Sequence, residues 1–384
     1  MKITVIGARG VPNVEGGAEK NAEMLFPLIA EKHDVTLYSI KGYSQATCYK
    51  GIKIINTPVF RLLGTEKLPC YIYATLRSFW ERPDIIHCQG LGSAVFLLLY
   101  KLAARRVVVR YGSVDYNMAK WSWIGRFGFR ISEWQLRFAD SVIAVAPSLK
   151  ERLVDRGYRV RIELIPNALD PVDCASEDAD QILETHKLES GRFVLGVGRL
   201  TAQKNFTTLL RAFRLFRDRT KGGFDRLVIA GGDDGSGYYQ RLLEEADDDV
   251  LFTGRLPRSE VRALFSRCGV YVNCSVHEGM SNAVLEAISA GCPVLLSDIV
   301  ENRDLPVDRR HFFTTDDPTA LADLLEEVSR QPRDFVVPLA PFANWRQVAA
   351  KTLALYDSLF ESAQSDATTL SGPRSSVSTH PKQE

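Results

Sequence analysis

The sequence lacks a long hydrophobic run and has no excess of charge of either sign. Its longest apolar segment, SAVFLLLYKLAA from Ser93, is interrupted by Lys101 and is too short to span a bilayer, so it predicts a buried helix. Lysine and arginine number 48 against 47 acidic residues, which gives a formal net charge of +1. This balance gives no global reason to expect nucleic acid or another strongly charged partner.

The chain also lacks a C-x-x-C pair, and its seven cysteines are an odd number in a long sequence. A reducing compartment fits this pattern best, which predicts a cytoplasmic protein. Met1 leads directly into KITVIG, a core-strand pattern, so we expect no signal peptide. At 384 residues with ordinary apolar and charged fractions, the chain is long enough for two soluble domains.

Short runs rich in Val and Ile alternate with helical patterns, which predicts parallel strands joined by crossover helices. Six runs precede Asn167 and five follow it; they are KITVIG, DVTLYS, IKIIN, DIIHC, RVVVR and SVIAVA, then RFVLGVG, RLVIAGG, VLFTG, VYVNCS and PVLLS. The acidic stretch PVDCASEDADQ separates the two series. We therefore expect an α/β chain with two Rossmann-like, doubly wound parallel-sheet domains facing a central cleft.

The predicted boundaries are residues 1–168 and 169–345 for the domains, 346–362 for a C-terminal helix and 363–384 for a disordered tail. The tail has no aromatic residue and no periodicity. In the first helix, apolar residues from Ala18 to Ile29 keep helical spacing, but Pro27 is expected to kink it.

In each series, one glycine-containing loop follows the first strand. GARGVPNVEGGAEK places Gly16 and Gly17 at a helix start, where backbone N–H groups can face an anion or a sugar oxygen. It is neither G-x-G-x-x-G nor a Walker loop. GVGRLTAQKN puts Arg199 and Lys204 at the corresponding helix mouth, where two cations suit a diphosphate. The alternatives are tight turns for the glycines and solvated surface charges for the cations.

The stretch SVHEGMSNAVLEAISAGCPVLLSD carries two acids in an apolar context. Ser281 or Asn282 is the expected N-cap of a helix that Gly291 ends, so Glu278 lies in the preceding loop and Glu286 one turn inside the helix. A carboxylate on so apolar a helix is costly without hydrogen bonds. Sugar hydroxyls could supply them, and phosphate oxygens could sit on the N–H groups of Gly279, Met280, Ser281 and Asn282. The alternatives are a buried arginine partner for Glu286 and a first-turn acid role for Glu278.

Four motifs in this order, GGAE, IPNALD, GRLTAQKN and E-x7-E within HEGMSNAVLEAISAGCPV, resemble glycosyltransferase family 4, retaining sugar-nucleotide enzymes of the GT-B fold. The likeness covers nearly the whole folded chain. GARGVPNVEGGAE with GSVDYNMAKW further resembles the branch that contains rhamnosyltransferase-like enzymes of bacterial surface polysaccharide assembly.

The resemblance implies a retaining, metal-independent hexosyltransferase with an acceptor-side N-terminal domain and a C-terminal domain that binds a nucleotide-diphosphate sugar. The acceptor would be a glycan or a polyprenyl-linked sugar, and no cofactor is needed because the donor is a substrate. On matching positions, Arg199 and Lys204 would contact the diphosphate, Glu286 the ribose and Glu278 the transferred sugar. Gly16 and Gly17 would approach from the other domain, and TGRLP, with Arg255, would border the base.

One departure concerns a histidine that many family members carry after the strand RVVVR, where this sequence has Tyr111 and Gly112. The role of that histidine cannot be transferred, and Asp115 is a candidate acceptor-side base. His87 is expected to pack or to order the cleft, and His277 fits either a structural or a functional role. We predict no metal site at the acidic stretches GGDDGSG and ADDDV.

The segment KWSWIGRFGFR mixes aromatic and basic residues, which suits either contact with the inner face of a bacterial membrane or a core helix with snorkelling arginines. Two rivals to the transferase remain. One is another GT-B enzyme, a nucleotide-sugar epimerase or a phosphorylase. The other is a non-catalytic nucleotide-sugar or polysaccharide-binding protein, which the retention of Arg199, Lys204, Glu278 and Glu286 together argues against.

Overall fold

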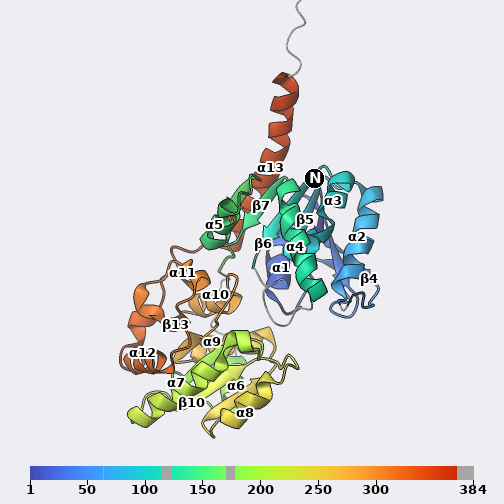
Figure 1. Cartoon of the computed structure of the whole chain (residues 1–384). Helices are drawn as coiled ribbons and strands as arrows, with labels where there is room; N and C mark the ends of the chain where they lie inside the picture. The colour runs from blue at the N-terminus through green and yellow to red at the C-terminus, as the bar shows by residue number, and fades with distance from the viewer. Residues whose placement is uncertain (64, 114–122, 170–177, 370–384) are drawn as a thin grey trace, which may run out of the picture.

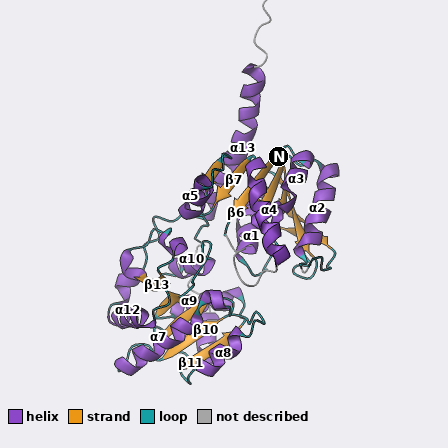
Figure 2. Ribbon diagram, in the orientation of Figure 1, coloured by secondary structure: helices purple, strands orange, loops and turns teal. Residues whose placement is uncertain are grey.

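The computed structural model describes residues 1–63, 65–113, 123–169 and 178–369. It contains two domains, each built on one largely parallel sheet with helices on both faces (Figures 1 and 2). This is the doubly wound pair that the alternating strand and helix patterns predict.

The N-terminal sheet has eight strands in the order β3-β4-β2-β1-β5-β6-β7-β8. Their bounds are β1 (Lys2–Ile6), β2 (Asp34–Ile40), β3 (Cys48–Tyr49), β4 (Ile52–Thr57), β5 (Ile85–Gln89), β6 (Arg106–Tyr111), β7 (Ser141–Ala144) and β8 (Ile162–Leu164). The prediction of six strands missed β3 and β8. Both are edge strands of two or three residues, too short to show an apolar period, and β3 pairs antiparallel with β4.

The C-terminal sheet has six strands in the order β11-β10-β9-β12-β13-β14, one more than predicted. Their bounds are β9 (Phe193–Val197), β10 (Arg226–Ala230), β11 (Val250–Gly254), β12 (Val270–Asn273), β13 (Val294–Ser297) and β14 (Phe312–Phe313). The additional strand, β14, has only two residues and lies at the sheet edge beside β13.

Helices cover both faces of each sheet. In the N-terminal domain they are α1 (Gly17–Ala30), α2 (Lys67–Glu81), the 3₁₀ helix η1 (Leu91–Phe96), α3 (Leu97–Ala103), α4 (Trp123–Gln135) and α5 (Pro147–Asp155). In the C-terminal domain they are α6 (Asp178–His186), α7 (Phe206–Arg219), α8 (Tyr238–Glu245), α9 (Arg258–Arg267), α10 (Asn282–Ser289), α11 (Val300–Arg303) and α12 (Pro318–Arg330). Helix α1 continues through Pro27 to Ala30.

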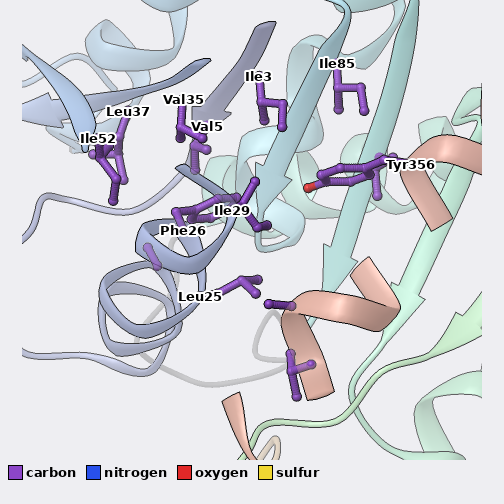
Figure 3. Close-up of a cluster of buried hydrophobic side chains, with 14 of the residues drawn as sticks. Ile3, Val5, Leu25, Phe26, Ile29, Val35, Leu37, Ile52, Ile85 and Tyr356 are labelled. Carbon is purple, nitrogen blue, oxygen red and sulfur yellow. The ribbon is translucent and has the colours of Figure 1, made fainter. Parts of the chain in front are cut away.

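The last helix, α13 (Trp345–Thr369), returns to the N-terminal domain. Its residues Val348, Tyr356 and Leu359 share one buried cluster with Phe26 and Ile29 of α1 and with strand residues such as Val5 and Ile85 (Figure 3). Helix α13, drawn in red in Figure 1, packs against α1. The helix is longer than predicted and ends at Thr369 instead of residue 362; residues 370–384 of the predicted tail lie outside the described residues.

Among the helices of the described ranges, none combines the length and the apolar character that crossing a bilayer requires.

Candidate active site

The candidate residues lie where strands end and helices begin, on the edges through which the two domains meet. Glycine-containing loops follow β1 and β9, and the loop Cys274–Ser281 joins β12 to α10. Carboxyl ends of parallel strands share one edge of a sheet, and such edges are the usual ligand sites of open α/β folds. The N-cap of α10 is Ser281, and Gly291 has a φ of 70°, as the sequence predicts for the two ends of this helix.

Glu278 is a buried carboxylate, 8% exposed, in the loop before α10. Its Oε1 forms an ion pair with Lys204 and accepts hydrogen bonds from Ser275 Oγ at 2.6 Å and from Asn273 Nδ2 at 3.5 Å. In the described part of the chain, Oε2 of Glu278 has no such partner. One oxygen therefore holds the carboxylate in place while the other is left for a ligand. Lys204, predicted to meet a diphosphate, is thus also the counter-ion of Glu278.

Glu286 is paired across the domain interface. Lys20 of α1 places Nζ 2.5 Å from Glu286 Oε1, and the two side chains are 7% and 20% exposed. The sequence left open a buried arginine partner for Glu286. The partner in the structure is a lysine, and it comes from the other domain. Oε2 of Glu286 has no hydrogen-bond partner among the described residues. As in Glu278, one carboxylate oxygen is therefore bound to a lysine and the other is left for a ligand.

The loop Gly279–Asn282 packs closely against the N-terminal domain. A Cβ on Gly279 would collide with the Gly112 carbonyl oxygen, and a Cβ on Gly17 would lie 3.2 Å from Asn282 Nδ2. Met280 packs against one core cluster of each domain. Within the described chain, no backbone hydrogen bond engages the N–H groups of Gly279 to Asn282. These amides at the start of α10 remain available to an anion.

Asn167, in the junction motif IPNALD, connects the two domains through its side chain. Its Oδ1 accepts from Arg110 Nη2 at 2.8 Å and from Asn21 Nδ2 at 3.4 Å. Its Nδ2 donates to the Met280 carbonyl at 3.4 Å and to Asn282 Oδ1 at 3.3 Å. The orientation of the loop that precedes α10 is therefore fixed against β6 and α1 of the N-terminal domain.

The network continues into the N-terminal core through three buried side chains. Gln89 Nε2 donates to Asn21 Oδ1 at 2.6 Å, His87 Nε2 lies 3.1 Å from Gln89 Oε1, and His87 Nδ1 lies 2.6 Å from the Tyr356 hydroxyl. Burial, with the nearby charge of Arg110, lowers the pKa of His87 to about 3, so the imidazole is neutral at physiological pH. The prediction that His87 packs is confirmed.

The first loop is held by its own ion pair. Arg9 Nε donates to Glu19 Oε1 at 2.9 Å, and the guanidinium stacks over Tyr43 with its Cζ 4.9 Å from the ring centroid. Burial acts to raise the pKa of Glu19, but the charges of Lys67 and Arg9 and the Arg9 hydrogen bonds outweigh it, and the pKa falls. Gly16 has a φ of 131°, which favours glycine, and both Gly16 and Gly17 are exposed.

The other two predicted cations are more accessible. Arg199 is exposed, and no ion pair or hydrogen bond of its side chain is found in the described ranges. Arg255 has a 69% exposed side chain, whose Nε lies 3.2 Å from Glu15 Oε1 of the other domain. Neither geometry assigns a ligand, so the roles implied for these two residues stay predictions.

Tyr111, at the position of the expected histidine, does not face the cleft. Its hydroxyl donates to Glu133 Oε1 at 2.8 Å, and its ring belongs to the cluster under α2 and α3. Glu133 also pairs with Arg156 at 2.6 Å. The tyrosine is thus a core residue that binds a buried carboxylate. The candidate base Asp115 lies outside the described residues.

His277 directly precedes Glu278 in the chain. Its Nδ1 lies 2.5 Å from Glu301 Oε1. Burial tends to raise the pKa of Glu301, yet the hydrogen bond from His277 brings it below its usual value. At the acidic stretch GGDDGSG, Asp233 and Asp234 accept hydrogen bonds from the amides of Gly235 and Ser236, as in a tight turn. No cluster of three or more His, Cys, Asp or Glu arranged for a metal ion occurs in the part of the chain that the structure describes.

Several contact residues were not predicted from the sequence. They are Lys20, Asn21, Gln89, Arg110 and Ser275, together with Arg258, which binds Glu23 Oε2 and the Val14 carbonyl across the interface, each at 2.9 Å. Polar residues in buried positions of α1, β5 and β6 were the available signal. Their partners, however, lie more than 60 residues away along the chain in most cases, beyond any local pattern.

Two family models match the chain, one on each domain. The model described as Glycosyltransferase Family 4 matches residues 16–173, and the model described as Glycosyl transferases group 1 matches residues 191–331. The GDP-mannose-dependent alpha-mannosyltransferase of Mycobacterium tuberculosis is 26% identical over 331 residues, 81% of this chain and 82% of the relative. The lipopolysaccharide core biosynthesis glycosyltransferase LpsE of Rhizobium meliloti is 23% identical, over 73% of this chain and 75% of its own length.

Solved structures share the two-domain fold at low sequence identity. Sucrose-phosphate synthase from Thermosynechococcus elongatus superposes with a TM-score of 0.73 at 20% identity, covering 94% of this chain and 99% of that one. HepE from Anabaena, solved in complex with UDP-glucose, has a TM-score of 0.72 at 18% identity, covering 95% and 100%. These similarities establish the GT-B fold.

Proposed function

We propose that this protein, a glycosyltransferase of the GT-B fold, is a retaining hexosyltransferase that uses a nucleotide-diphosphate sugar in bacterial surface polysaccharide synthesis. The observation that carries the proposal is the paired arrangement of Glu278 and Glu286. Each carboxylate holds a lysine through Oε1 and leaves Oε2 without a partner in the described chain. Two such acceptors beside free amides fit a ligand that presents both hydroxyls and an anion.

The donor would extend along the start of α10. Glu286 Oε2 would accept from the ribose, Glu278 Oε2 from the transferred sugar, and the N–H groups of Gly279 to Asn282 would bind the diphosphate. Each hydrogen bond to a carboxylate contributes about 1.5–3 kcal/mol. Arg255, which the family resemblance of TGRLP implies beside the base, would close the nucleotide end.

Transfer breaks the bond between the anomeric carbon and the diphosphate oxygen and forms a bond from that carbon to an acceptor oxygen. The acceptor proton passes to the departing phosphate. Arg199 and Lys204 would stabilise the charge that develops on the leaving nucleotide, the function that a metal ion serves in other transferases. Departure and attack on one face of the sugar would retain configuration without a covalent enzyme intermediate.

Turnover of UDP-, GDP- and dTDP-sugars, with lipid-linked and free glycan acceptors, tests the proposal. We expect nucleoside diphosphate release that depends on an acceptor. Isomerisation of the donor without acceptor would indicate an epimerase, and dependence on inorganic phosphate a phosphorylase. Glu286→Ala should weaken donor binding. Arg199→Ala and Lys204→Ala should chiefly slow the step in which the nucleoside diphosphate leaves the sugar. Unchanged transfer in all three would refute the site.

The relatives frame the choice of substrates. Named activities among them include GDP-mannose-dependent mannosyl transfer and lipopolysaccharide core synthesis, and the HepE structure contains UDP-glucose. GDP-mannose and UDP-glucose are therefore the first donors to test. A rhamnosyl donor follows from the resemblance of the first loop and GSVDYNMAKW, and dTDP-linked rhamnose tests that branch.

We further propose peripheral contact with the inner face of the membrane, made by the exposed faces of α2, α3 and α4. These helices are neighbours in the fold (Figure 1). Their apolar side chains Trp80, Leu102, Trp123 and Phe127 are 77%, 73%, 76% and 59% exposed. The start of α4 is thus not a core helix. Exposed arginines on α4 suit anionic lipid headgroups.

Flotation with phosphatidylcholine vesicles, with and without phosphatidylglycerol, tests the membrane contact. We expect binding only to the anionic vesicles, and loss of binding in the double variant Trp123→Ser, Phe127→Ser. Leu243→Ser on α8, which removes another exposed apolar side chain, is the matched control. A protein that stays unbound to anionic vesicles would contradict this part of the proposal.

A further inference from the structure

Lys20 is a buried cation at the interface of the two domains, and no sequence motif singled it out. It lies at the start of α1, three residues after Gly17, and its side chain is 7% exposed. A positive charge at a helix N-terminus is opposed by the helix dipole. Burial there is costly for an ammonium group unless anions face it.

Glu286 supplies one such anion, but the proposed function gives this carboxylate a second task. If Glu286 Oε2 accepts a ribose hydroxyl, Lys20, which is bound to Oε1 of the same carboxylate, brings a cation of the N-terminal domain next to the nucleotide. The diphosphate arrives with the ribose and is covalently attached to it. A lysine carries its charge on a flexible four-carbon chain, so a small rotation would move Nζ from the carboxylate to a phosphate oxygen.

The surroundings of Lys20 support an anion at this place. The starts of α1 and α10 meet here, since a Cβ on Gly17 would lie 3.2 Å from Asn282 Nδ2. Arg9 of the first loop forms an ion pair with Glu19, and Lys204 of the C-terminal domain forms one with Glu278. Lys20 reaches this junction from α1 of the N-terminal domain, whereas Arg199 and Lys204 belong to the C-terminal domain.

We propose that Lys20 is a donor-binding residue supplied by the N-terminal domain, and that its ammonium binds the diphosphate of the nucleotide sugar. The proposal rests on the proposed function, because it requires a nucleoside diphosphate in this cleft. It makes donor affinity dependent on the approach of the two domains, since the cation and Glu286 belong to different ones.

Calorimetric titration of the full chain with UDP, GDP and dTDP, and with the matching nucleosides, tests this inference. Lys20→Met should weaken binding of the preferred nucleoside diphosphate by about 10- to 100-fold, the range of one charged hydrogen bond. Affinity for the nucleoside should not fall, because Glu286 remains. Lys20→Arg should recover most of the diphosphate affinity, and Lys32→Met, an exposed lysine just after α1, should bind like the wild type.

Equal losses for the diphosphate and the nucleoside, or no loss for either, would overturn the role of Lys20. Lys20→Met leaves Glu286 unpaired and could prevent folding. In that case the double variant Lys20→Met, Glu286→Gln is compared with Glu286→Gln alone. The same selective loss of diphosphate affinity is expected. A wild-type protein that binds none of the nucleotides would refute the proposed function instead. The two failures are therefore distinguishable.

Discussion

Asn167→Ala tests how strongly the domain junction depends on one side chain. Asn167 Oδ1 accepts a hydrogen bond from Arg110, a residue that is 3% exposed. Arg110 also donates to the Ile165 carbonyl at 3.3 Å. Burial lowers the pKa of Arg110 to about 10, still well above neutrality, so the side chain is charged at physiological pH. Removing the amide leaves a buried cation short of an acceptor.

The expected loss follows from the geometry. The Arg110–Asn167 bond at 2.8 Å is charge-assisted and contributes about 1.5–3 kcal/mol. The three longer bonds of Asn167, at 3.3–3.4 Å, together add about 1 kcal/mol. Asn167→Ala should therefore lower the free energy of unfolding by about 2.5–4 kcal/mol. The same change frees Met280 and Asn282, so the KM for the donor should rise as well.

A double-mutant cycle measured by urea unfolding isolates the central bond. Arg110→Met removes the charge that needs the amide, so Asn167→Ala should cost about 1.5–3 kcal/mol less in that background than in the wild type. Far-UV circular dichroism reports the unfolding of both domains. Effects that add within about 0.5 kcal/mol would refute the claim that Asn167 compensates the buried arginine.

Three further outcomes are expected. His87 binds a proton near pH 3 when folded but near its ordinary pKa when unfolded, so its contribution to stability should fall by about 1.4 kcal/mol per pH unit from pH 6.5 down to pH 3, and His87→Gln should flatten that slope. Tyr111→Phe should cost about 1.5–3 kcal/mol of stability, from the lost bond to the Glu133 carboxylate, without changing kcat; a large fall in kcat would place Tyr111 at the reaction after all. Gly279→Ala should push the Gly112 backbone away and raise the KM for the donor severalfold with a folded chain, whereas an unchanged KM would show that this contact does not position the donor loop.

The sequence by itself determined the local features of the fold. Apolar runs of five or six residues specify β1 and β6, and the step from N-cap Ser281 to Gly291 specifies α10. That spacing is enough to put Glu278 in a loop and Glu286 inside a helix, because each depends only on neighbouring residues. The very short strands β3, β8 and β14 escaped prediction because two or three residues show no period.

Tertiary structure alone decided which groups meet. Lys20 and Glu286 are 266 positions apart, and Arg110 and Asn167 are 57 apart, so no local pattern links them. The packing of α13 on α1 was likewise not predictable from a local pattern. An amphipathic sequence predicts that a helix has an apolar face, but not which surface buries that face. The chemical type of each site residue is thus known from the sequence. The packing of the two domains decides which partner each residue has, and therefore which carboxylate oxygen is left for a ligand.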